Sequence, residues 1–282
     1  MIASLRNLLR PREAMPQPAI PAGQRVYAIG DIHGRLDLFS ALVSAIEADD
    51  RDRASAETTV ILLGDLVDRG PDSAGVLRLA RQWGEHRRVR ILAGNHEEMM
   101  LGALESVDML RRFVNPIGGG RETLLSFGIP ERDYTRASWV ELQAMARGAV
   151  GPDTLAFLQS FEDLITIGDY CFVHAGIRPG LALDQQTGPD LRWIREPFLP
   201  TPASHGAVIV HGHTINEEPQ FRPNRIGLDT GAYASGRLTA MGLEGEARWL
   251  LCAQAPTQPE GISGWPDTAP AGAITIHRRD AA

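Results

Sequence analysis

Five short apolar segments of this chain each end in a polar, glycine-containing motif. They are RVYAIGD, TVILLGD, VRILAGN, YCFVHAG and AVIVHGHT. Apolar runs of this length are typical of strands that are covered on both faces. Where such strands run parallel, their carboxyl ends meet at one edge of the sheet, and ligands bind there. The pattern therefore predicts an α/β fold with one polar site at the strand ends.

Helical patterns follow the first three of these segments. Leu36, Phe39, Val43 and Ile46 recur at helical spacing. Ser73 is expected to cap a helix over AGVLRLARQWG, and EMMLGALESVDML is also predicted to be helical. The resulting order, βαβαβα, indicates a largely parallel sheet with short strand-to-helix loops.

The rest of the chain divides by composition. Residues 1–24 are expected to be a leader and Pro-rich linker, 25–253 the main folded domain, and 254–282 a Pro/Gly-rich tail whose ITIHRR segment adds an edge strand. Within the domain, 99–160 is predicted to be a helical insertion over the site. The segment RIGLDTGAYASGRLTAMGLEGEARWLLCAQ is predicted to form antiparallel strands joined by glycine turns.

The overall composition excludes several classes of function. A net charge of −7 argues against binding nucleic acid or an anionic membrane through bulk electrostatics, although a phosphorylated substrate remains compatible with it. All 28 basic residues are Arg, which excludes Schiff-base and P-loop lysines. We find no membrane span or signal peptide and expect a cytoplasmic protein with Cys171 and Cys252 as buried free thiols.

The polar residues at the strand ends are typical metal ligands. Carboxylate, imidazole and amide groups without thiolate suit Mn²⁺, Fe or Zn²⁺, and there are enough of them for two ions that share a carboxylate. The residues are Asp31, His33, Asp65, Asn95, His96, His174, His211 and His213, with Asp68 and Arg69 beside them.

The motifs GDIHG, GDLVDRG, GNHE, VHAG and HGHT together resemble those of calcineurin-like metallophosphoesterases. The phosphoprotein phosphatase branch, with its bacterial and phage serine/threonine phosphatases, is the most similar, and symmetrical diadenosine tetraphosphate hydrolases are close relatives. The resemblance covers about residues 25 to 250. It implies two packed mixed β-sheets flanked by helices, with a dimetal site at the carboxyl ends of the strands.

The resemblance also implies a role for each motif residue. Asp31 and His33 would bind the first metal, and Asp65 would bridge both. The second metal would be bound by Asn95, which also faces substrate, together with His174 and His213.

The remaining motif residues would act on the substrate. His96 would be the general acid, Asp68 would orient it, and Arg69 would hold phosphate oxygens. A second phosphate-binding arginine is expected in DLRWIREPFL. The WIRxxF setting favours Arg195 over Arg192.

One departure from the superfamily pattern distinguishes between branches of the superfamily. Generic phosphodiesterases end in GHxH, whereas Ile215 stands two residues after His213 here, which favours the phosphatase branch over nuclease-like members. His211 has no liganding role in the pattern and is expected to be a packed residue.

These observations predict a dinuclear metallophosphatase that hydrolyses phosphate monoesters by direct attack of a metal-bridging water. We expect a serine/threonine protein phosphatase using two Mn²⁺, with Fe or Zn²⁺ as the other ions possible. Symmetrical diadenosine tetraphosphate hydrolysis is the alternative. For that substrate, four aromatic residues could stack an adenine instead of packing in the core: Phe113, Phe127, Tyr134 and Trp139.

A third hypothesis is a scaffold that keeps the fold and binds partners, but it predicts broken ligand motifs, and these are intact. The expected partners are therefore substrates: a phosphorylated protein or a small phosphoester. The sequence leaves the oligomeric state open.

Overall fold

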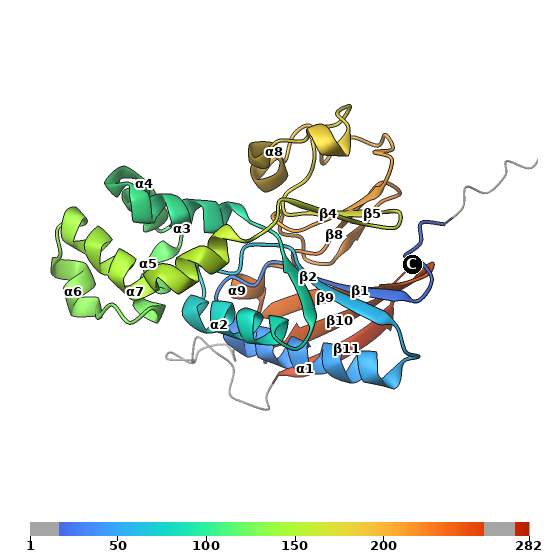
Figure 1. The fold of residues 1–282 in the computed structure, drawn as a ribbon, viewed down its shortest axis with the longest axis horizontal. Helices are drawn as coiled ribbons and strands as arrows, with labels where there is room; N and C mark the ends of the chain where they lie inside the picture. Colours follow the sequence, from blue (N-terminus) through green and yellow to red (C-terminus); the bar gives the residue numbers. More distant parts are fainter. Residues whose placement is uncertain (1–16, 257–273, 282) are drawn as a thin grey trace, which may run out of the picture.

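The computed structural model describes residues 17–256 and 274–281, and in it two β-sheets pack face to face with helices outside them (Figure 1). Both sheets mix parallel and antiparallel pairs. The α/β prediction of two packed mixed sheets is therefore confirmed. Residues 1–16 of the predicted leader and 257–273 of the predicted tail lie outside the described residues.

The larger sheet has six strands in the order β11-β10-β9-β1-β2-β3. The first three strands in the chain are parallel. Strand β9 pairs antiparallel with β1, β10 with β9, and β11 with β10. The predicted edge strand exists as β11. The bounds are β1 Gln24–Ile29, β2 Glu57–Leu62, β3 Arg88–Ile91, β9 Arg237–Glu244, β10 Ala247–Gln254 and β11 Thr275–Asp280.

The smaller sheet has five strands in the order β4-β5-β6-β8-β7. Its central strands β5, β6 and β8 are parallel. One sequence expectation is wrong here: the predicted C-terminal meander is not continuous, because β8 joins this sheet while β9 and β10 form a hairpin in the other. The bounds are β4 Leu164–Ile167, β5 Tyr170–Val173, β6 Val208–His211, β7 Gln220–Phe221 and β8 Arg225–Gly227.

Alternate strand residues face different layers of core. Val26 and Ala28 of β1 pack between the sheets against Phe172 of β5, while Tyr27 and Ile29 face the helices on the outside. This two-residue period, buried on both sides, explains why the strand segments are apolar throughout. The strand ends, and with them the polar motifs, are thereby held at fixed positions.

Two helices, α1 (Leu36–Asp52) and α2 (Ser73–Gly84), cover the outer face of the larger sheet (Figure 1). The predicted capping of α2 by Ser73 is wrong. The cap is Asp72, whose carboxylate accepts the Gly75 N–H at 2.7 Å. Ser73 is the first residue of the helix, and its hydroxyl is used in the site instead.

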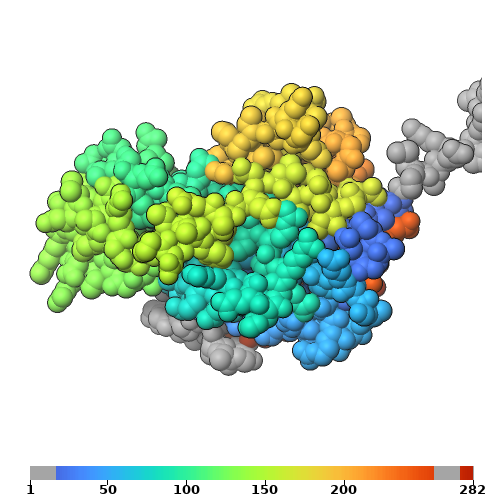
Figure 2. Space-filling view, viewed as in Figure 1, coloured from blue at the N-terminus to red at the C-terminus, as the bar shows by residue number. Residues whose placement is uncertain are grey.

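Residues 95–159 form a helical lobe beside the sheets, on the left in Figures 1 and 2. The helix predicted over EMMLGALESVDML is two helices, because Ser106 is extended (φ −132°, ψ 131°). The last helix bends at Gly151, which has a φ of 70° and precedes Pro152. The lobe contains α3 Asn95–Glu105, α4 Val107–Phe113, α5 Gly120–Ser126, α6 Glu131–Arg136 and α7 Trp139–Gln159.

Three short helical segments follow the lobe: a 3₁₀ turn at Leu183–Gln185, α8 (Gly188–Trp193) and α9 (Ala232–Ser235). Within the described residues, no helix combines the length and apolar character that a bilayer crossing requires. Both cysteines are free, as predicted, although Cys252 is only partly buried.

Candidate active site

The ends of five strands bring the polar motifs together in one place. The residues after β1, β2 and β3 come from the larger sheet, and those after β5 and β6 come from the smaller one. All of the following side chains are at most 7% exposed: Asp31, His33, Asp65, Asp68, Asn95, His96, His174 and His213. Buried polar groups at this density need partners or a ligand.

Two groups of three residues place their potential metal-binding atoms within 4.8 Å of one another. One group is His33, Asp65 and His96, and the other is Asp65, His174 and His213. Asp65 belongs to both, as expected of a shared carboxylate. Asn95 joins the second group, because its side-chain oxygen lies 3.1 Å from Nε2 of His174.

Backbone carbonyls fix how two of the imidazoles face the site. Nδ1 of His33 lies 2.8 Å from the Val67 carbonyl, and Nδ1 of His174 lies 2.7 Å from the Leu63 carbonyl. In a neutral ring that nitrogen donates its proton, which leaves a lone pair on Nε2. Nε2 of His174 lies 3.4 Å from Asp65, and Nε2 of His33 lies 3.6 Å from Asp65 and accepts a hydrogen bond from the Arg69 guanidinium at 2.9 Å. Both rings are thus oriented as potential metal ligands.

Asp31 lies beside these groups rather than within either of them. Its carboxylate accepts the backbone N–H of His213, at 3.0 and 3.2 Å. Burial, followed by the neighbouring carboxylates of Asp229 and Asp65, raises the pKa of Asp31 well above its usual range. Burial likewise raises the pKa of Asp229 to about 6. Cations beside these carboxylates would relieve the crowding of negative charge.

The donor set fits divalent metal ions. His213 has a buried Nε2 without a hydrogen-bond partner, and burial together with His174 lowers the pKa of His213 to about 3, which keeps its ring neutral. Imidazoles, carboxylates and an amide oxygen that converge without thiolate suit Mn²⁺, Fe or Zn²⁺.

His96 and Asp68 form a buried dyad. Nδ1 of His96 lies 2.7 Å from Oδ2 of Asp68. Burial opposes the charged form of His96, but the carboxylates of Asp65 and Asp68 outweigh it and raise the pKa of the ring. This arrangement favours a protonated His96 that can donate a proton from its other nitrogen.

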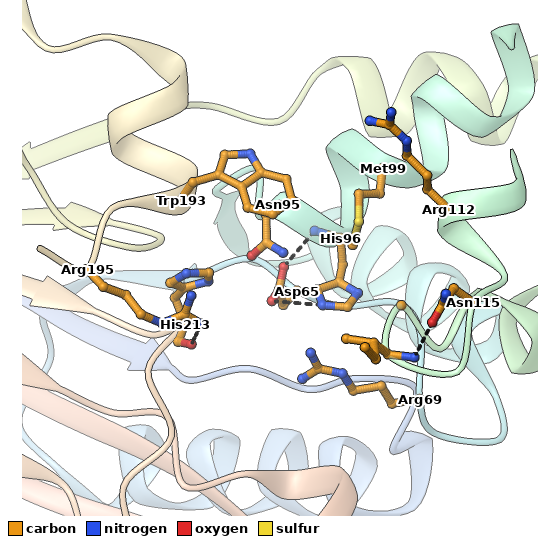
Figure 3. A pocket seen from close by; sticks show the side chains of 12 residues that line it. Asp65, Arg69, Asn95, His96, Met99, Arg112, Asn115, Trp193, Arg195 and His213 are labelled. Carbon is orange, nitrogen blue, oxygen red and sulfur yellow. Dashed lines mark hydrogen bonds and ion pairs between the residues drawn. The ribbon is translucent and has the colours of Figure 1, made fainter. Parts of the chain in front are cut away.

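A cavity of about 390 Å³ opens over these groups (Figure 3). Figure 3 shows Arg69, Arg112 and Arg195 on different sides of Asp65. Arg192 lies outside the cavity lining and pairs with Asp163 and Glu98. The structure thus places Arg195, and not Arg192, at the site. The lining consists of Asp65, Arg69, Asn95, His96, Met99, Arg112, Asn115, Ile117, Gly118, Trp193, Arg195 and His213.

A model of the calcineurin-like phosphoesterase family matches residues 24–236. The chain belongs to this family. It is therefore a hydrolase of phosphoester bonds that depends on divalent metal ions, in agreement with the converged histidines and carboxylates.

Curated relatives of this phosphoesterase are bis(5'-nucleosyl)-tetraphosphatases. The symmetrical enzyme of Nitrosococcus oceani is 30% identical over 278 residues, covering 80% of this chain and 96% of the relative. The asymmetrical enzyme of Bacillus velezensis is 28% identical over 232 residues, covering 75% and 86%.

Solved structures share this fold. A putative diadenosine tetraphosphatase is 22% identical with a TM-score of 0.54, covering 80% of this chain and 94% of that one. A cold-active protein tyrosine phosphatase is 21% identical with a TM-score of 0.57, covering 86% and 84%. At these identities the likeness shows the fold alone.

Glu97 organises the loop that carries Asp65 in this phosphoesterase. Its buried carboxylate accepts the backbone N–H groups of Gly94, Asp65 and Leu66 at 2.7 to 2.9 Å. Sequence reasoning quoted this residue within GNHE but gave it no role. Glu97 holds the end of β2 against the start of α3, so Asp65 and His96 are fixed together.

Five non-glycine residues have left-handed backbone conformations, and all five lie at the site. Among the described residues, they are His33, Asp65, Asp68, Arg69 and His213, with φ between 46° and 73°. Such conformations are costly and persist where the surrounding structure enforces them. The local backbone strain of this phosphoesterase is thus concentrated at the candidate active site.

Sequence analysis missed two further residues at the site. Asp229 lies two residues beyond the end of β8, so the segment IGLD has the same strand-end pattern as the other motifs. The pattern was overlooked because this segment was predicted to belong to an antiparallel meander. The Arg69 guanidinium lies over the Tyr233 ring, with its central carbon 4.7 Å from the ring centroid, and the edge of the same ring packs against His33. No short motif marks Tyr233.

None of the four aromatic residues considered for adenine stacking lines the cavity. Phe113 is buried in the lobe, and Trp139 packs under Arg111. The aromatic side chain at the cavity is instead Trp193, which is 40% exposed. His211 is buried beside Phe198, as expected of a packed residue.

Proposed function

We propose that this phosphoesterase hydrolyses dinucleoside polyphosphates, cutting a phosphoanhydride bond. The motifs alone favour a serine/threonine protein phosphatase. The curated relatives support the alternative, because those aligned over most of this chain carry the name tetraphosphatase.

The observation that carries the proposal is the charge of the cavity wall. Arg69, Arg112 and Arg195 all line it, and none of them forms an ion pair with a carboxylate within the described residues. By contrast, Arg111 and Arg192 nearby are both paired with carboxylates. One phosphate monoester carries at most two negative charges, so three guanidinium groups without carboxylate partners suit a chain of several phosphates better.

We assign the metal ligands as the motifs imply. Asp31, His33 and Asp65 would hold one ion. The second would be held by Asp65 with Asn95, His174 and His213. Manganese fits this donor set, and bound ions of this kind supply Lewis acidity and a readily deprotonated water.

The chain's own residues would then act on the phosphate. Arg69 and Arg195 hold the oxygens of the phosphoryl group that is attacked, with Asn95 beside them. His96 donates the proton on Nε2 to the leaving oxygen, and Asp68 holds Nδ1–H so that the ring stays aimed. Trp193 and Ile117 offer apolar cavity walls to the rest of the substrate.

The test compares three substrates with Mn²⁺-loaded protein and a chelated control: diadenosine tetraphosphate, a phosphothreonine peptide and p-nitrophenyl phosphate. We expect metal-dependent turnover to be fastest on the dinucleotide. Turnover led by the peptide would reject the proposal in favour of a protein phosphatase.

Arg112 gives the sharper measurement. Arg112→Met should raise KM for diadenosine tetraphosphate about tenfold and leave p-nitrophenyl phosphate unaffected, because only the longer substrate reaches this guanidinium. The matched control is Arg111→Met. Arg111 is the preceding residue of α4, pairs with Asp108 and lies outside the cavity lining. An equal KM change in both variants would contradict the role of Arg112.

We also propose a cytoplasmic location. Two cysteines that are free rather than bridged are typical of a reducing compartment.

A further inference from the structure

A hydroxyl group from the helical lobe contacts the catalytic dyad. Oγ1 of Thr123, in α5, lies 2.6 Å from Oδ1 of Asp68 and 2.9 Å from the Asp68 backbone nitrogen. Ser73, at the start of α2, lies 2.8 Å from the Thr123 hydroxyl and 2.9 Å from the same nitrogen. All three side chains are 0% exposed.

The protons of this network can be assigned. An ionised Asp68 only accepts, so Thr123 donates its single hydroxyl proton to Oδ1, and His96 donates Nδ1–H to Oδ2. The Ser73 hydroxyl then donates to Thr123, and the Asp68 N–H is shared between the two hydroxyl oxygens. Each side-chain oxygen of Asp68 therefore has one donor, and the carboxylate has a single favoured orientation.

The same part of the lobe supports the next residue of the loop. The Gly119 carbonyl accepts the Arg69 backbone N–H at 3.0 Å, and a Cβ on Gly119 would lie 2.7 Å from the Arg69 side chain. Asp68 and Arg69 both have positive φ values, of 73° and 69°. A strained pair of this kind depends on outside contacts for its conformation, and residues 119–123 provide them.

We propose that Thr123 is a positioning residue for proton donation. It fixes the Asp68 carboxylate, and through it the direction of the His96 ring, so the lobe takes part in acid catalysis as well as in forming the cavity wall. This inference rests on the acid role proposed for His96, but not on the identity of the substrate.

Leaving-group dependence tests the proposal with Mn²⁺-loaded full-length protein. Thr123→Val keeps the shape and removes the donor, while Thr123→Ser keeps the donor. A p-nitrophenolate leaves readily without a proton, whereas a phenolate needs one. We expect Thr123→Val to lower kcat about tenfold more for phenyl phosphate than for p-nitrophenyl phosphate, with Thr123→Ser close to wild type.

Ser126→Ala is the matched control, because Ser126 ties α5 to α2 through the Ala74 N–H without touching Asp68. It should leave the ratio of the two rates unchanged. An equal loss on both substrates in Thr123→Val, or a loss that serine does not restore, would show a purely structural role. Should the valine variant not fold, Thr123→Ala carries the same expectation.

His96→Asn separates the two hypotheses. If it slows phenyl phosphate preferentially and Thr123→Val does not, the positioning role fails and the acid role stands. If His96→Asn slows both substrates equally, the acid role fails, and the inference about Thr123 fails with it.

Discussion

At the scale of single residues, the site depends on strained backbone. Asp65 carries a φ of 51°, and its carboxylate is shared between both groups of ligand atoms. Gly94 allows this geometry, because a Cβ there would lie 2.1 Å from Oδ1 of Asp65. Aspartate and asparagine tolerate left-handed backbone better than other residues with side chains.

Asp65→Asn should therefore fold normally and bind metal poorly. The variant keeps the conformation but loses the negative charge that two cations would share. We therefore expect lower metal content and a turnover lower by at least about a hundredfold, which is the usual effect of removing one group that stabilises charge in a transition state. Metal analysis of the purified variant measures the first effect. Full metal occupancy would contradict the bridging role.

The strand-end residues were predictable because each follows an apolar segment whose direction the sheet fixes. His33, Asp65 and His174 belong to this class. Thr123 was not predictable, because its role depends on the lobe folding back onto the loop after β2, 55 residues earlier in the chain. Local patterns carry no information on such an approach.

At the scale of elements, one carboxylate joins α1 to the larger sheet. Asp49 accepts hydrogen bonds from the Tyr27 hydroxyl of β1 at 2.6 Å and from the Trp249 indole of β10 at 2.9 Å. It also pairs with Arg53 and with Arg278 of β11. Burial acts against the ionised form, but these hydrogen bonds and charges prevail and lower the pKa of Asp49.

Asp49→Asn should lower stability in a pH-dependent way. A carboxyl whose pKa is lower in the folded state contributes stability above its unfolded pKa, and that contribution disappears as the pH falls through the folded pKa. The stability gap between wild type and variant should therefore be full near neutral pH and shrink in acid. Urea unfolding at several pH values measures it. The matched control is Asp52→Asn, at an exposed position of the same helix. Its stability should equal that of the wild type at both neutral and acidic pH.

Element bounds were less predictable than element types. The break at Ser106 and the transfer of β8 to the smaller sheet both leave local composition unchanged, so hydrophobic periodicity could not reveal them. What decided them was packing between segments distant in the chain.

At the scale of the whole molecule, the site lies where the two sheets meet. His33 and Asp65 follow strands of the larger sheet, whereas His174 and His213 follow strands of the smaller one. Ions bound between them would join the sheets directly. Binding free energy would then appear as stability of the whole fold.

Mn²⁺ should accordingly raise the melting temperature, on the order of 5 °C when the free ion is 100-fold above its dissociation constant. Calorimetry with and without chelator measures this. His213→Ala should reduce the shift, because it removes a ligand supplied by the smaller sheet. A shift that persists in this variant would place the ions elsewhere.

Strand β1 pairs with β2 on one side and with β9 on the other. Strand β9 ends at residue 244, more than two hundred residues after the end of β1. On a ribosome that adds about 5–20 residues per second, one edge of β1 stays open for about 10 s or more before β9 has been made. The growing chain therefore exposes one edge of the hydrophobic strand β1 while the helical lobe and the smaller sheet are being made.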